Sequence, residues 1–158
     1  MVAEPATASQ ARRNPWLIVA AAAYASALVV VLLWPTHVDG EGGFIRFEPI
    51  LDVLSALGIP AWASYPWVEF AANMALFLPL GILWVVAARA PRFRRIATAT
   101  VLAAAISIGA EALQHLIVPD RTTDARDVVA NVSGAALGAL AVIAVARRVG
   151  AVGRSPAA

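Results

Sequence analysis

Four long apolar runs, each about as long as a bilayer is thick, limit what this chain can fold into. We expect them at residues 16–34, 67–88, 96–118 and 124–146. A helix needs about 20 mostly apolar residues to cross a hydrocarbon core of ~30 Å, and only helices and closed barrels satisfy the backbone polar groups inside lipid. The runs therefore predict an all-α fold, a bundle of four transmembrane helices.

The composition excludes several other classes of protein. Hydrophobic residues make up 61% of the 158 positions and charged residues only 14%, far from the composition of a soluble domain. The 12 basic residues are all arginines, but they lie at the ends of the apolar runs rather than along one basic face, which argues against nucleic acid as a partner. The chain has no cysteine, so disulfides, thiolate catalysis and Cys-based metal sites are excluded.

The arginines also predict the topology. They gather before the first run, in the turn 89–95 and after the fourth run. By the positive-inside rule, both termini and this turn are cytoplasmic. We expect disordered cytoplasmic tails at 1–15 and 149–158 around a single transmembrane domain, 16–148. A cleaved signal peptide is a weaker alternative for the first run, because the apolar sequence continues well past the small residues at 25–27.

The segment 36–66 is the longest one that does not span. Apolar residues recur in it at helical spacing, at Ile50, Leu51, Val53, Leu54 and Leu57. This spacing predicts a short amphipathic helix at the membrane interface in the first outward loop, with a plain surface loop as the alternative. Trp62, Tyr65 and Trp67 are aromatic residues of the kind found at head-group level.

Three of the four runs carry polar or small residues in stripes spaced by three or four. The stripes are Glu69, Asn73, Phe77 and Gly81; Ser107, Glu111, Gln114 and Val118; and Asp124, Asp127, Asn131, Gly134 and Gly138. With ~1.5 Å of rise per residue, Asn73, Glu111 and Asn131 all lie about 10 Å below the outer boundary. We therefore expect the three stripes to face one another at one level.

Two features of these runs predict helix packing. Gly134 and Gly138 form a G-x-x-x-G pattern, which allows a neighbouring backbone to approach closely, whereas Ala139 is expected on a different face. Pro79 lies in the middle of its run, where it removes a backbone hydrogen bond and is expected to kink the helix.

Three segments of the chain resemble the VanZ-like family of bacterial membrane proteins. They are Asn73-Met-Ala-Leu-Phe77-Leu-Pro79-Leu-Gly81, Glu111-Ala-Leu-Gln114, and the segment from Arg121 to Gly138 that contains Asp124, Asp127, Asn131 and Gly134. The resemblance covers about residues 67–146. It implies a small multi-helix protein of the bacterial cytoplasmic membrane, in a family whose namesake is linked to resistance against the glycopeptide teicoplanin. It supplies no established reaction.

The polar residues admit structural as well as chemical explanations. Glu111 and His115 are one turn apart and could share a metal ion or a proton, but the chain lacks further ligands nearby, so no metal site is predicted. Glu111 could instead hydrogen-bond Gln114, Asn73 or Asn131 and fix the packing of the helices. Asp124 could be the N-cap of the last helix.

Three classes of function stay open at this stage. They are a membrane enzyme acting on a lipid-linked envelope substrate, a binder or small transporter of an envelope lipid, and a structural membrane subunit. For the first two we expect Glu111 and Asp127 as catalytic acid or base and a set of ligand-binding residues comprising Asn73, Gln114, Arg121, Asp124 and Asn131. Pro79, Gly81, Gly134 and Gly138 are expected to serve helix packing. Membrane lipids and a lipid-linked envelope precursor are the expected partners; no cofactor is indicated.

Overall fold

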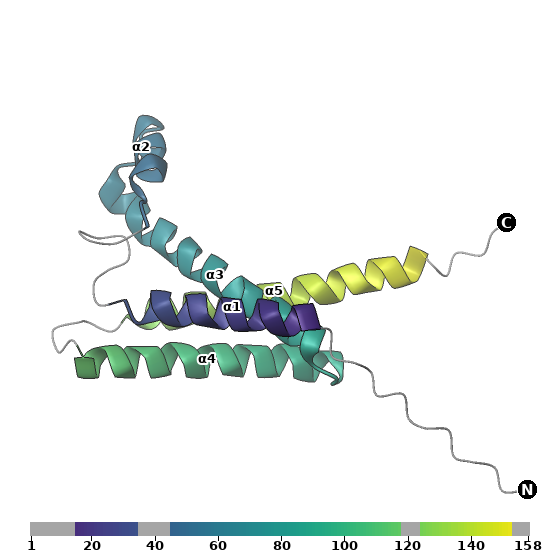
Figure 1. Cartoon of the computed structure of the whole chain (residues 1–158). Helices are drawn as coiled ribbons and strands as arrows, with labels where there is room; N and C mark the ends of the chain where they lie inside the picture. Colours follow the sequence, from purple (N-terminus) through teal and green to yellow (C-terminus); the bar gives the residue numbers. More distant parts are fainter. Residues whose placement is uncertain (1–14, 35–44, 118–123, 153–158) are drawn as a thin grey trace, which may run out of the picture.

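The computed structural model describes residues 15–34, 45–117 and 124–152, and all regular elements in these ranges are helices. They are α1 (Pro15–Leu32), α2 (Glu48–Ala56), α3 (Ala61–Ala87), α4 (Arg92–Ile117) and α5 (Ala125–Val152) (Figure 1). All but the short α2 are long and apolar enough to cross a membrane. The prediction of an all-α fold with four spans and one short helix between the first two is confirmed for the described chain.

The helices differ from the predicted spans mainly at the start of α3 and at the end of α5, which continues to Val152, past the predicted end at 146 and into the predicted tail. Helix α3 begins at Ala61, six residues before the predicted span, because the N-cap residue Pro60 has an extended backbone and the helix follows it directly. Trp62 and Trp67, expected at head-group level, therefore lie within α3, where their side chains are 81% and 69% exposed. Helix α3 also continues through Pro66 and Pro79.

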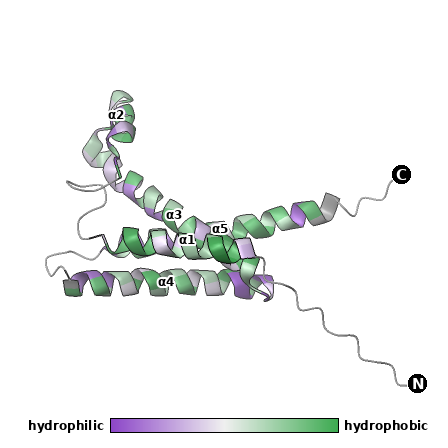
Figure 2. Cartoon of the chain, in the orientation of Figure 1, coloured by the Kyte–Doolittle hydropathy of each residue, from purple (hydrophilic) through white to green (hydrophobic). Residues whose placement is uncertain are grey.

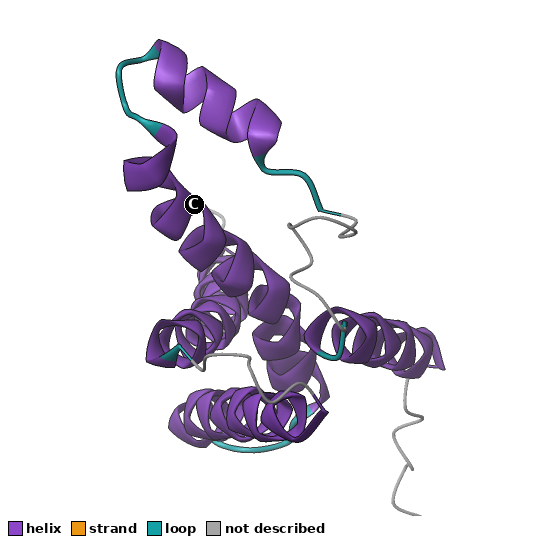
Figure 3. Ribbon diagram, turned by 90° about the vertical axis from the view of Figure 1, so that its left-hand side faces the viewer, coloured by secondary structure: helices purple, strands orange, loops and turns teal. Residues whose placement is uncertain are grey.

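Four passes bring both ends of the described chain to one side of the bundle (Figure 1). The C-terminal ends of α1 and α4 and the N-terminal end of α5 lie at the opposite side, while α3 crosses the other long helices obliquely (Figures 1 and 3). Helix α2 lies beyond the bundle, next to the start of α3. Figure 2 shows hydrophobic residues along most of α1 and strongly hydrophilic ones in the first turn of α4.

The outer surface of the long helices is rich in exposed apolar side chains. Examples are Val19 on α1, Val86 on α3, Val101 on α4 and Val145 on α5, each more than half exposed. Such a surface would be a liability in water, but it is the surface that a transmembrane bundle presents to lipid.

Small side chains dominate the interior. One cluster of buried residues joins α1, α3, α4 and α5 through Leu28, Phe77, Ala103 and Ala135. A second joins α3, α4 and α5 through Val85, Ala99, Ala139 and Ile143. Phe77 is the one large side chain among the described residues that is fully buried. Because lipid supplies no hydrophobic force between helices, close packing of small residues is what holds such a bundle together.

The closest helix contact in the bundle is between α3 and α5, and glycines make it possible. A Cβ added to Gly134 would collide with the backbone carbonyl of Met74, and one added to Gly138 would collide with that of Leu78. From the other side, a Cβ on Gly81 would collide with the carbonyl of Ala135. The two backbones therefore touch along about two turns.

The expectation that Ala139 lies on a different face from this contact is wrong. Ala139 is fully buried, and its backbone nitrogen also lies close to Gly81. The reason is that α5 packs against both α3 and α4, as Val85 and Ala99 in the same cluster show. Its buried face is therefore wider than the stripe of glycines.

A side chain from α1 supports the proline in the middle of α3. Pro79 has no N–H, so the carbonyl of Ala75 loses its usual helical donor. The Tyr24 hydroxyl donates to the Leu76 carbonyl at 2.9 Å, and the Leu80 backbone also hydrogen-bonds this hydroxyl. A neighbouring helix thus supplies polar contacts where the proline interrupts the ladder.

Candidate functional site

The polar stripes of α3 and α5 meet at a hydrogen bond between Asn73 and Asp127. The Asn73 amide nitrogen donates to Asp127 Oδ1 at 2.8 Å, and both residues are partly buried. An amide is a suitable partner here because it offers a donor to the carboxylate without adding a second charge. These two predicted site residues, 54 positions apart in sequence, are therefore neighbours.

Asp124 is the N-cap of α5, which agrees with the structural interpretation of this residue in the sequence. Its Oδ1 accepts the backbone N–H of Arg126 at 2.9 Å, and its carbonyl accepts the N–H of Asp127 at 2.9 Å. A cap of this kind satisfies N–H groups that the first helical turn leaves without partners. The cap orients the first turn of α5 so that Asp127 points towards α3.

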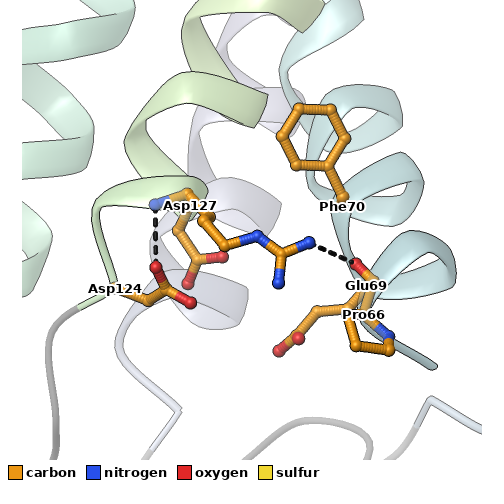
Figure 4. Close-up of a pocket in the computed structure, with 6 residues that line it drawn as sticks. Pro66, Glu69, Phe70, Asp124 and Asp127 are labelled. Carbon is orange, nitrogen blue, oxygen red and sulfur yellow. Dashed lines mark hydrogen bonds between the residues drawn. The ribbon is translucent and has the colours of Figure 1, made fainter. Parts of the chain in front are cut away.

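A shallow, open recess lies beside this turn, between α3 and α5 (Figure 4). Its lining combines apolar, acidic and basic side chains: Pro66, Glu69 and Phe70 from α3, and Asp124, Arg126 and Asp127 from α5. The guanidinium of Arg126 donates to the Pro66 carbonyl at 3.4 Å and lies 5.8 Å from the centre of the Trp67 ring. The recess can therefore offer hydrogen-bond acceptors and one cation to a ligand, next to an apolar wall.

Glu111 of α4 is adjacent to this group. Its carboxylate interacts electrostatically with Asp127 and, more weakly, with Asp124. Its Oε1 atom is buried and has no hydrogen-bond partner among the described residues. Since all three groups are carboxylates, their mutual interaction is repulsive.

The amides expected to hydrogen-bond Glu111 donate elsewhere. Asn73 donates to Asp127, and Asn131 donates to the Ser107 hydroxyl at 2.9 Å in the buried contact between α4 and α5. Gln114 donates to the carbonyl of Leu32 at the end of α1. The Gln114 bond ties α4 to α1, so the structure does not bring this predicted ligand-binding residue to the Asn73–Asp127 pair.

Two further parts of the sequence analysis concern Arg121 and His115. Arg121, predicted to contact an anionic ligand, lies outside the described residues. The side chain of His115 is exposed, and no group of three or more His, Cys, Asp or Glu residues in the described ranges is arranged to hold a metal ion.

The structure adds functional candidates that the sequence-based list omitted. Glu69, Phe70 and Arg126 line the recess, and Ser107 is the partner of Asn131. The helical spacing contained a signal for two of them, because Glu69 lies one turn from Asn73 and Ser107 one turn from Glu111. Phe70 and Arg126 lie off the polar stripes, and only the angle at which α3 crosses α5 brings them together.

Comparison with known proteins identifies a family. Residues 21–146, most of the chain, match the family model described as VanZ/LLP1. This range contains α2, α3 and α4, most of α1 and α5, and the whole candidate site. Comparisons with curated proteins and with solved structures found no significant match.

Proposed function

Because the chain belongs to the VanZ/LLP1 family, we propose that it acts at the bacterial cell envelope, in protection against glycopeptides of the teicoplanin type. In this proposal, the outer ends of α3 and α5 hold the head group of a lipid-linked envelope ligand. The observation that carries the proposal is the recess, where acidic and basic side chains lie beside an apolar wall at a membrane-facing helix contact.

The chemistry of the recess indicates which head groups fit. Carboxylates such as those of Glu69 and Asp127 accept hydrogen bonds from hydroxyl and amine groups, and a guanidinium such as that of Arg126 donates to phosphate. A lipid phosphate that carries a sugar presents both kinds of group. The exposed Trp62 and Trp67 at the same end of α3 suit the boundary between head group and acyl chain.

Within this proposal, Glu111 and Asp127 are the candidate acid and base. Their carboxylates interact electrostatically, and like charges at short range favour having one group protonated while the other is ionised. An acid and a base side by side can transfer a proton to and from a bound head group. Arg121, at the outer end by sequence, is proposed to contact an anionic part of the ligand.

The test is glycopeptide susceptibility of a susceptible bacterial host that expresses the protein. We expect Asp127→Asn, Arg126→Gln and Glu111→Gln to lose the protection given by the wild type at matched membrane abundance. Asp52→Asn on α2 and Arg148→Gln near the C-terminal end of α5 are matched controls, since both residues are exposed and neither lines the recess. Full protection by all three site variants would contradict the proposal.

A second measurement separates binding from catalysis. If the recess holds a lipid, the purified wild type should retain it in native mass spectrometry and Arg126→Gln should release it. Chemical conversion of a lipid-linked substrate that Glu111→Gln abolishes, with lipid retention unchanged, would establish an enzyme. Retention without conversion would establish a binder or transporter.

A further inference from the structure

The contact between α4 and α5 contains buried oxygen atoms that lack hydrogen-bond donors. Asn131 and Ser107 are only 3% and 2% exposed, and the Asn131 amide nitrogen donates to the Ser107 hydroxyl oxygen. The other polar atom of this amide, Oδ1, is buried and has no partner among the described residues. One helical turn from Ser107, Glu111 Oε1 is also buried without a partner. A buried acceptor without a donor costs about 1–3 kcal/mol.

The charges around these atoms have the same sign. Glu111 interacts with the carboxylates of Asp127 and Asp124 on α5, and α3 contributes the neutral amide of Asn73, which donates to Asp127. Arg126, a cation in the first turn of α5, donates to the Pro66 carbonyl of α3. The surroundings of Glu111 and Asn131 therefore combine acceptors with negative charge, in a part of the bundle where an uncompensated charge is costly.

From this combination, we propose that the α4–α5 contact binds a monovalent inorganic cation, with sodium as the probe. Glu111 supplies the charged oxygen, and Asn131 and Ser107 supply an amide and a hydroxyl oxygen. The carboxylate of Asp127 adds further negative charge. Hard cations prefer oxygen donors such as carboxylate, amide and hydroxyl groups. The inference does not depend on the identity of the envelope ligand, because sodium binding is measured without that ligand, although Asp127 also lines the recess.

The cation also explains why these residues are polar. A bound ion would satisfy both unpartnered oxygens at once and would offset the repulsion between Glu111 and Asp127. Binding to the folded state alone raises its stability in proportion to the logarithm of the ion concentration once the site is filled. Sodium should therefore stabilise the bundle specifically, rather than through ionic strength.

The experiment is thermal unfolding of the purified full-length protein in detergent. The salt is sodium chloride or N-methyl-D-glucamine chloride at equal ionic strength. We expect a higher melting temperature in sodium, with a shift that grows with the logarithm of the sodium concentration once the site is filled. Glu111→Gln and Ser107→Ala should both abolish the sodium-dependent part of the shift. Ser107→Ala keeps the inference testable if the Glu111→Gln variant does not fold.

Two matched variants serve as controls. Ser133→Ala removes a hydroxyl from a partly buried position of α5, and Asp52→Asn removes an exposed carboxylate of α2. Both should keep the full sodium-dependent shift. Equal melting temperatures of the wild type in the two salts would overturn the inference, as would a shift that persists in both Glu111→Gln and Ser107→Ala. Neither outcome would affect the glycopeptide test of Arg126→Gln, because Arg126 lines the recess and is not part of the cation site.

Discussion

At the scale of single residues, the polar side chains of the bundle act mainly between helices. Several hydrogen bonds join different helices, among them those from Tyr24 to the carbonyl of Leu76, from Asn73 to Asp127, from Gln114 to the carbonyl of Leu32, and from Asn131 to Ser107. Each bond fixes the rotation of one helix relative to another. Apolar side chains cannot do this alone, because they contact lipid as favourably as they contact another helix. Polar residues in these spans thus determine the arrangement as well as the chemistry.

The bond between Asn73 and Asp127 makes a measurable prediction. In a double-mutant cycle with Asn73→Ala and Asp127→Ala, the free energies of unfolding in mixed micelles should show a coupling of about 0.6 kcal/mol, the average for hydrogen bonds between membrane helices, and at most about 1.7 kcal/mol. The control cycle pairs Asn73→Ala with Asp124→Ala, because Asp124 caps α5 instead of contacting Asn73. Additive effects in the first cycle would show that the bond contributes nothing.

A second cycle tests the role of Tyr24 at the proline. Tyr24→Phe removes the donor to the Leu76 carbonyl and should lower the free energy of unfolding by about 1 kcal/mol. In a Pro79→Ala background, the backbone N–H groups of α3 can restore the regular ladder, so the same change should cost clearly less. An equal loss of stability in both backgrounds would show that the contribution of the Tyr24 hydroxyl does not depend on Pro79.

At the scale of elements, the sequence predicted which segments form helices and which face of each helix points inward. It was less successful at predicting which helices contact one another. Periodicity alone was enough to place Asn73, Phe77 and Gly81 on one face, because side chains four apart share a face. It could not reveal that Gln114 reaches α1, since its acceptor is a backbone carbonyl and α1 carries no polar side chain opposite. It also missed the wide buried face of α5, because alanine occurs against lipid as well as inside a bundle, so a single alanine does not mark a buried position.

The backbone contact of α3 and α5 gives the prediction at this scale. Gly134→Ala and Gly81→Ala each place a Cβ against a backbone carbonyl, so each should destabilise the protein by about 1–3 kcal/mol, as overpacking does. Gly109→Ala on α4 is the matched control, because a Cβ there meets no atom within 4 Å. It should be neutral or stabilising, since alanine favours a helix over glycine. Equal losses at all three positions, measured by thermal unfolding in detergent, would contradict the close contact.

At the scale of the whole molecule, charge is unevenly distributed between the two ends of the bundle. The arginines of the α3–α4 turn and of the end of α5 lie at one end, and at the other lie α2 with its acidic residues, the recess and the N-cap of α5. Arg46 and Arg126 are at the acidic end, where Arg46 forms an ion pair with Glu48 at 3.6 Å. This is the asymmetry from which the sequence predicts that the arginine-rich end is cytoplasmic.

The orientation can be tested because the chain contains no cysteine. Ser55 is on α2 at the acidic end, and Ser155 follows α5 in the sequence, outside the described residues. If the arginine-rich end is cytoplasmic, a membrane-impermeant thiol reagent should label Ser55→Cys in intact cells and Ser155→Cys only after the membrane is permeabilised. The physical reason is that arginines resist translocation across the membrane and so remain inside. Labelling of Ser155→Cys but not Ser55→Cys in intact cells would invert the topology and place the recess on the cytoplasmic side, where it could not meet an external glycopeptide.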